Sequence, residues 1–93
     1  MAGPSATDHY QAAVYYKDVE DFTKAKEHID KAVSISKEPR FWVLRQQSLI
    51  YEKNGDKAGA IKAAKASLEL AEKAKNADYV KLNKDSLKEW GAK

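Results

Sequence analysis

The 93-residue chain has no cysteine, four glycines and two prolines. Without cysteine there is no disulfide framework, and the count leaves the redox compartment open. No apolar run approaches the roughly 18 residues that span a bilayer. Apolar and polar residues nowhere alternate over the length of a strand, so the sequence predicts no sheet. The first residues lack a basic region followed by an apolar one, which excludes a signal peptide.

What the chain does contain is typical of a small helical domain. Hydrophobic residues make up 43% of it and charged residues 33%, and alanine, lysine, glutamate and leucine are frequent. A chain of this length forms one domain, with no room for a buried active-site cavity of any size. The net charge of +3 comes from 17 basic and 14 acidic residues that are interleaved. This pattern favours solubility, and we do not expect nucleic-acid binding.

The stretch from Phe41 to Leu70 organises the rest. Apolar residues at helical spacing predict two amphipathic helices, from about Pro39 to Lys53 and from Asp56 to about Lys75. Pro39 suits the first helical turn, where a missing N–H is not felt. Gly55 stands where a left-handed C-cap is wanted, and Asp56 can cap the following helix.

Three further helices flank this hairpin. The first is predicted over about Asp8 to Lys17, with Ser5, Thr7 or Asp8 as its N-cap. The second is predicted to begin after an Asp21 cap and to extend to Ser36. The fifth is predicted to begin after an Asp78 cap and to end before Gly91. Asn76 is expected to close the fourth helix. The predicted organisation is a flexible or engineered leader (1–7), a helical domain (8–90) and a tail (91–93).

An internal repeat of 35 residues relates the two hairpins. The shift places five pairs of similar residues together: Tyr16 and Tyr51, Asp21 and Asp56, Ala25 and Ala60, Ala32 and Ser67, and Ile35 and Leu70. Two helices per unit at a period near 34 residues is typical of tetratricopeptide repeats. The segment YEKNGDKAGAIKAAKASLEL resembles the core of such a repeat, and YKDVEDFTKAKEHIDKAVSI resembles it with Glu20 in place of the glycine.

The resemblance implies an all-α fold, a right-handed array of two repeat units and a C-terminal capping helix that begins a third unit. It covers about Asp8 to Trp90, although His9 and Leu44 stand at the usual tryptophan position. The segments FWVLR and NADYVKLNKDSLKEW are also similar to the C-terminal helical segment of a bacterial family of unknown function. Members of that family are often exported. If this chain is part of a longer bacterial protein of that kind, the resemblance implies an exported or periplasmic location.

By resemblance to the repeat family, the first helix of each unit lines a concave groove that binds a peptide or partner domain. An aromatic and several aliphatic residues beside basic ones suit a peptide with an acidic flank, although Trp42 and Leu49 could equally pack against neighbouring helices. The family's carboxylate clamp is not expected, since its positions match Tyr10, Val14, Gln46, Ala77 and Lys81, with one basic residue. The predicted binding residues are Tyr10, Val14, Lys17, Trp42, Arg45, Leu49, Lys84 and Lys88, with Glu52, Val80 and Leu87 beside them.

Self-assembly is the alternative function. Fewer than three full units leave an open end that a homodimer could bury, with a candidate patch of Tyr10, Tyr15, Trp42 and Leu49. Catalysis is not expected, because no serine has a base and an orienting acid in reach. His9 and His28 each have an acidic sequence neighbour that points elsewhere on a helix, so neither of these pairs is a metal ligand set. The sequence implies no cofactor and no metal.

Overall fold

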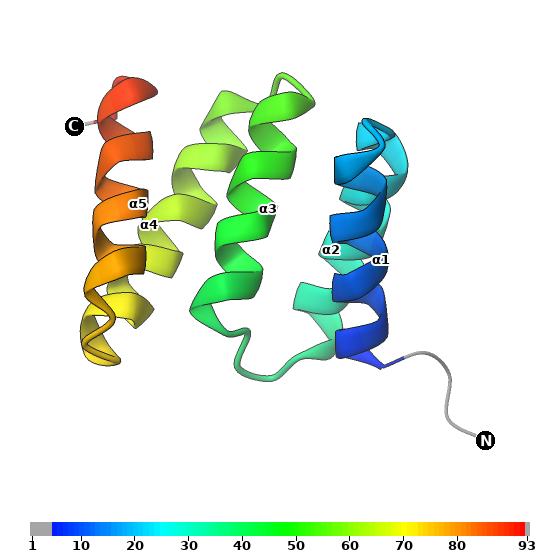
Figure 1. Ribbon diagram of the computed structural model, residues 1–93, viewed down its shortest axis with the longest axis horizontal. Helices are drawn as coiled ribbons and strands as arrows, with labels where there is room; N and C mark the ends of the chain where they lie inside the picture. Colours follow the sequence, from blue (N-terminus) through cyan, green and yellow to red (C-terminus); the bar gives the residue numbers. More distant parts are fainter. Residues whose placement is uncertain (1–4, 93) are drawn as a thin grey trace.

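The computed structural model describes residues 5–92, which form five helices and no strand. Figure 1 shows them as two antiparallel hairpins followed by a single helix. The helices are α1 (Ala6–Asp18), α2 (Phe22–Ile35), α3 (Phe41–Lys53), α4 (Lys57–Lys73) and α5 (Ala77–Glu89). Helix α3 contacts both α1 and α5, whereas α2 and α4 do not meet within the described part of the chain.

Alanine and serine occupy most of the buried positions in the two hairpins. Ala13, Ala25, Ile29 and Ile50 form a fully buried cluster. Along α4 the buried positions are occupied by alanine and serine, from Ala60 to Ala71. Small side chains let two helix backbones approach closely, which explains how so few large apolar residues suffice for a core.

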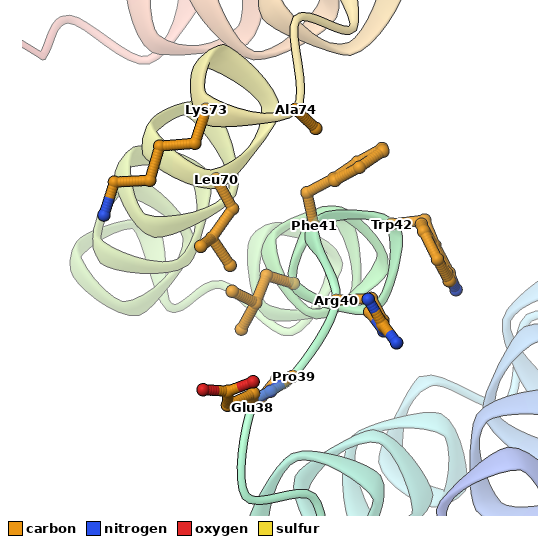
Figure 2. Close-up of a pocket in the computed structure, with 9 residues that line it drawn as sticks. Glu38, Pro39, Arg40, Phe41, Trp42, Leu70, Lys73 and Ala74 are labelled. Carbon is orange, nitrogen blue, oxygen red and sulfur yellow. The ribbon is translucent and has the colours of Figure 1, made fainter.

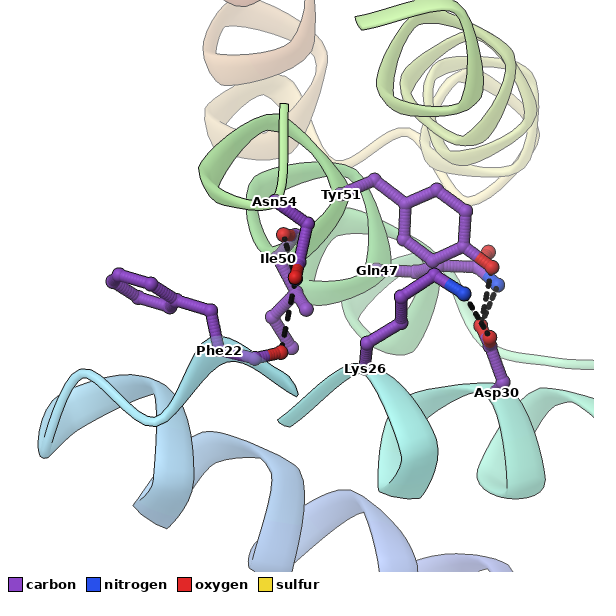
Figure 3. A network of polar contacts seen from close by, with 7 residues as sticks. All are labelled: Phe22, Lys26, Asp30, Gln47, Ile50, Tyr51 and Asn54. Atoms are coloured by element: carbon purple, nitrogen blue, oxygen red, sulfur yellow. Dashed lines mark hydrogen bonds and ion pairs between the residues drawn. The ribbon is translucent and has the colours of Figure 1, made fainter. Parts of the chain in front are cut away.

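Polar contacts join the two hairpins. Tyr51 of α3 donates its hydroxyl hydrogen to Asp30 of α2 at 2.6 Å, and Gln47 donates to the same carboxylate oxygen at 3.3 Å (Figure 3). Burial and the Asp30 carboxylate raise the pKa of Tyr51 to about 12. At the other end of this contact Asn54 donates to the Phe22 carbonyl at 2.9 Å. The register between the units is therefore fixed by hydrogen bonds as well as by packing.

Several predicted boundaries are confirmed and others are wrong. Asp21 and Asp56 cap α2 and α4 through their side chains. However, α1 begins at Ala6, because Ser5 and Asp8 form a reciprocal capping box. Part of the predicted leader is thus helical, and residues 1–4 lie outside the described residues. The third helix begins two residues after Pro39, because Arg40 is extended and acts as its N-cap.

The connection between α4 and α5 also differs from the prediction. Lys75 has a positive φ of 57° and ends α4, so α4 stops at Lys73. The side chain of Asn76 then accepts a hydrogen bond from the Tyr79 N–H at 3.1 Å. Asn76 therefore caps α5 rather than closing α4, and Asp78 lies inside the first turn of α5.

The two turns within the hairpins share one conformation despite different residues. Glu20 has a φ of 63° and Gly55 a φ of 81°, so both are left-handed, the region where a Cβ costs roughly 1–2 kcal/mol. In the first turn the Asp21 N–H donates to the Tyr16 carbonyl at 2.8 Å, and the Asp56 N–H donates equivalently to Tyr51 at 2.9 Å. The 35-residue repeat aligns Glu20 with this glycine.

We expect Glu20→Gly to raise the free energy of unfolding by about 1 kcal/mol, because glycine removes the left-handed penalty. The reciprocal Gly55→Glu should cost a similar amount, since an added Cβ meets no atom within 4 Å and only backbone conformation changes. Urea denaturation of both variants measures the two changes. A destabilised Glu20→Gly chain would contradict the assignment of strain to this residue.

Candidate functional site

The odd-numbered helices are tied together along one face. The Lys17 ammonium of α1 donates to the Gln46 amide oxygen of α3 at 2.7 Å. On the other side of α3, Arg45 Nη1 donates to Ser86 Oγ of α5 at 2.7 Å and to the Leu82 carbonyl and Asn83 Oδ1 at 3.3 Å each. We call the surface of α1, α3 and α5 around these contacts the inner face.

Arg45 carries an uncompensated positive charge at the centre of this face. Its three acceptors are neutral, and no carboxylate oxygen lies within 4.0 Å of it among residues 5–92. Burial lowers the pKa of its guanidinium, while Tyr79 raises it. An arginine nevertheless stays charged in a protein. A half-buried cation without a counter-ion is a strong point of attraction for an anionic group.

Tyr79 of α5 lies near this charge, and Tyr10 of α1 lies near Tyr79. Burial raises the pKa of Tyr10 in α1, and the neighbouring Tyr79 of α5 raises it further. Tyr79 also packs its ring against Phe41 at 4.9 Å between centroids. Side chains from α1 and α5 therefore converge across α3.

Trp42 stands at the edge of the same face. Trp42 is 38% exposed, so its side chain is partly packed against the protein and partly open to solvent. The Arg40 guanidinium lies 5.9 Å from its ring centroid, within the range of a cation–π contact. The Phe41 ring meets it edge-on at 5.0 Å.

A hollow lies on each side of Trp42. One has a volume of about 520 Å³ and lies between the start of α3 and the end of α4, where Phe41, Leu70 and Lys73 line it (Figure 2). The other, of about 450 Å³, is lined by Tyr10 of α1. Trp42 and Arg40 border both hollows.

The structure brings some of the predicted binding residues together and separates others. Tyr10, Lys17, Trp42 and Arg45 belong to the inner face described above, and Val14 and Leu49 are half-buried on the same helices.

Lys84 and Lys88 lie elsewhere. Lys84 and Val80 line a hollow with Glu72 and Lys75 at the end of α4. Lys88 is close enough to Asp85 to help lower the pKa of that carboxyl group. Among residues 5–92, no hydrogen bond, ion pair or shared hollow joins either lysine to Trp42 or Arg45.

Sequence reasoning missed the α5 residues that do meet Arg45. Leu82, Asn83 and Ser86 accept hydrogen bonds from it, and Tyr79 raises the pKa of its guanidinium. Of these four residues, Tyr79 and Leu82 belong to the apolar stripe that the periodicity of the fifth helix indicates. The apolar stripe predicts that these two residues are buried in the core. It does not give the rotation of α5 about its axis, so it does not predict their position beside Arg45.

Two antiparallel hairpins of one design, stacked side by side and closed by a further helix, define a helical-repeat protein. A family model of the tetratricopeptide repeat matches residues 9–39 and 46–74, together about two thirds of the chain. The chain therefore belongs to the tetratricopeptide repeat family, whose repeats generally mediate protein–protein interaction and are typically non-catalytic. Searches of curated proteins and of solved structures find no match.

Two further findings bear on ligands. No described helix is both long and apolar enough to cross a membrane. Among residues 5–92 there is no cluster of three or more histidine, cysteine, aspartate or glutamate side chains that could hold a metal ion.

Proposed function

We propose that the inner face docks a peptide segment of a partner protein, and that an acidic side chain of the peptide pairs with Arg45. The observation that carries the proposal is the half-buried Arg45 guanidinium, which is held in place by three neutral acceptors of α5 and has no carboxylate within 4.0 Å among the described residues. Its position is fixed before any ligand arrives, so little side-chain entropy is lost on binding.

The surroundings of Arg45 support an apolar residue beside the acidic one. Trp42 offers an exposed aromatic edge with a hollow on either side, and aromatic residues of this kind commonly anchor interfaces. Lys17 adds a second positive charge on the α1 side. We expect a ligand that alternates acidic and large apolar side chains along an extended or helical segment.

The test is selection from a library of random displayed peptides against the purified chain, followed by fluorescence polarisation of the enriched sequences. We expect enrichment of aspartate or glutamate next to an aromatic or aliphatic residue. Arg45→Gln should weaken these peptides at least about 10-fold, because a hydrogen bond to a charged group contributes about 1.5–3 kcal/mol.

Lys84→Gln is the matched control. It removes the same charge from a basic residue that the structure places in a different hollow, beside Glu72, and it should leave peptide affinity unchanged. Equal losses for the two variants would mean that the peptides respond to net charge alone, and the site would be rejected. Circular dichroism of each variant confirms that the helices persist.

Self-assembly would use the same surface differently. Size-exclusion chromatography with light scattering should give a monomer of about 10.4 kDa at every concentration if the face is free for a foreign ligand. A concentration-dependent dimer that Trp42→Ala abolishes would replace the docking proposal by homodimerisation.

We also propose that this module is joined to other domains in a longer bacterial protein, as the similarity of its C-terminal segment implies. The gene that encodes the chain tests this directly. A reading frame limited to these 93 codons would contradict it.

A further inference from the structure

The two histidines of the chain meet between α1 and α2. His9 Nδ1 and His28 Nδ1 are 3.1 Å apart, and the ring centroids are separated by 5.3 Å with a tilt of 31°. Both residues are half-buried. The Tyr16 ring stacks on the His28 ring at 5.4 Å with planes only 12° apart. The two imidazoles are thus held in place from two helices, with part of each ring open to solvent.

The second repeat unit shows what this position requires for packing alone. The 35-residue shift places His9 on Leu44 and His28 on Ala63. Leu44 and Ala63 are both buried and line a common hollow between α3 and α4. Two apolar side chains therefore occupy the equivalent positions in the second unit. The first unit has an imidazole at both positions, and the chain has no other histidine.

We propose that His9 and His28 form a two-imidazole site for a divalent late transition-metal ion such as Zn²⁺ or Ni²⁺. A metal–nitrogen bond is about 2.0–2.1 Å long, so two nitrogens on one ion lie about 2.9 Å apart at a right angle and about 3.4 Å apart at the tetrahedral angle. The observed separation of 3.1 Å falls between these values.

Binding requires one rearrangement of protons. With both rings neutral, this contact is a hydrogen bond in which one Nδ1–H donates to the lone pair of the other Nδ1, so neither Nδ1 lone pair is free for a metal. When the ion binds, the donating ring shifts its proton from Nδ1 to Nε2, and both Nδ1 lone pairs then face the metal. The neutral rings lose no proton overall.

The remaining coordination positions go to water. The Asp8 carboxylate beside His9 already accepts the Ser5 backbone N–H at 3.0 Å, and no group of three candidate ligand residues exists in the described part of the chain. Imidazole nitrogen favours zinc, nickel and copper over magnesium and calcium, which prefer oxygen. The ion would clip α1 to α2 in the unit at the N-terminal end of the array.

The experiment is thermal unfolding of the tag-free chain with Zn²⁺, with Ni²⁺ and with Mg²⁺. At a free Zn²⁺ concentration ten times the dissociation constant, we expect Tm to rise by about 6 °C, because the ion binds the folded pair and not the separated residues. Mg²⁺ should have no effect. An unchanged Tm with both Zn²⁺ and Ni²⁺ up to millimolar concentration would overturn the proposal.

The second repeat unit supplies the control variants. The double substitution His9→Leu with His28→Ala introduces the two apolar residues that stand at the equivalent buried positions of the second unit, so it should remain folded and lose the Zn²⁺ response. Each single substitution should lose the response to the same extent, because a chelate needs both rings. Nitrogen-15 NMR should show both Nδ1 resonances shifting together with Zn²⁺. A single variant that keeps the Tm increase, or a shift of one ring alone, would show monodentate binding and refute the site.

Discussion

Asn83→Ala should lower the free energy of unfolding by about 3 kcal/mol, a large effect for one amide of a capping helix. Asn83 is 0% exposed. Its Nδ2 donates to Ser67 Oγ of α4 at 2.8 Å, and its Oδ1 accepts from Arg45 of α3 at 3.3 Å. Ser67 in turn donates to the Phe41 carbonyl at 2.7 Å. The amide therefore joins three helices, and its removal leaves a cavity and two weakened partners.

Two companion variants separate these causes. Asn83→Leu fills the space but makes no hydrogen bond, so we expect it to remain about 2 kcal/mol less stable than the parent chain because polar partners stay buried. Lys84→Ala, at the next and exposed position, should change stability by less than about 0.5 kcal/mol. Urea denaturation measures all three. Full recovery with leucine would show that the hydrogen bonds of Asn83 contribute nothing.

The sequence predicted the starts of α2 and α4 well, because an aspartate side chain caps each of them. Asp21 and Asp56 sit at equivalent positions of the repeat and accept from the backbone as expected. The boundary before α5 was wrong because Asn76 and Asp78 are both good caps. Lys75 decides between them by adopting a positive φ, and nothing in a lysine signals that conformation. Glu20 adopts the same region, and there only its alignment with Gly55 gave a clue.

The candidate site was harder to predict because it depends on the rotation of whole helices. Periodicity groups residues along one helix but does not say which neighbour each stripe meets. Lys84 was therefore combined with Trp42, although the structure associates it with the end of α4. The inner-face residues remain a prediction as ligand contacts. In α5 the hydrogen bonds from Arg45 go to Leu82, Asn83 and Ser86 instead.

The contact between His9 and His28 was also not predicted from the sequence. Sequence reasoning compared each histidine with its adjacent acidic residue, and adjacent residues diverge on a helix. His9 and His28 are 19 positions apart and meet only through the register of the α1–α2 hairpin. The register was available from the repeat, since the same shift maps them onto Leu44 and Ala63.

Ala60→Leu tests this register in the second unit. Ala60 is 0% exposed on the side of α4 that packs against α3, and its neighbour Gly59 lies so close to the Tyr51 ring that an added Cβ would overlap it. Three extra carbon atoms at Ala60 would force α3 and α4 apart or drive side chains off their rotamers. We expect a loss of about 1–3 kcal/mol.

The repeat provides both controls for this substitution. Ala25 is the equivalent residue of the first unit and is also 0% exposed, so Ala25→Leu should cost a similar amount. Ala58 lies on the same helix but is exposed, and Ala58→Leu should change stability by less than about 0.5 kcal/mol. Thermal and urea unfolding of the three variants compare them directly. A neutral Ala60→Leu would mean that α3 and α4 do not cross there, and the 35-residue alignment of the two hairpins would fail with it.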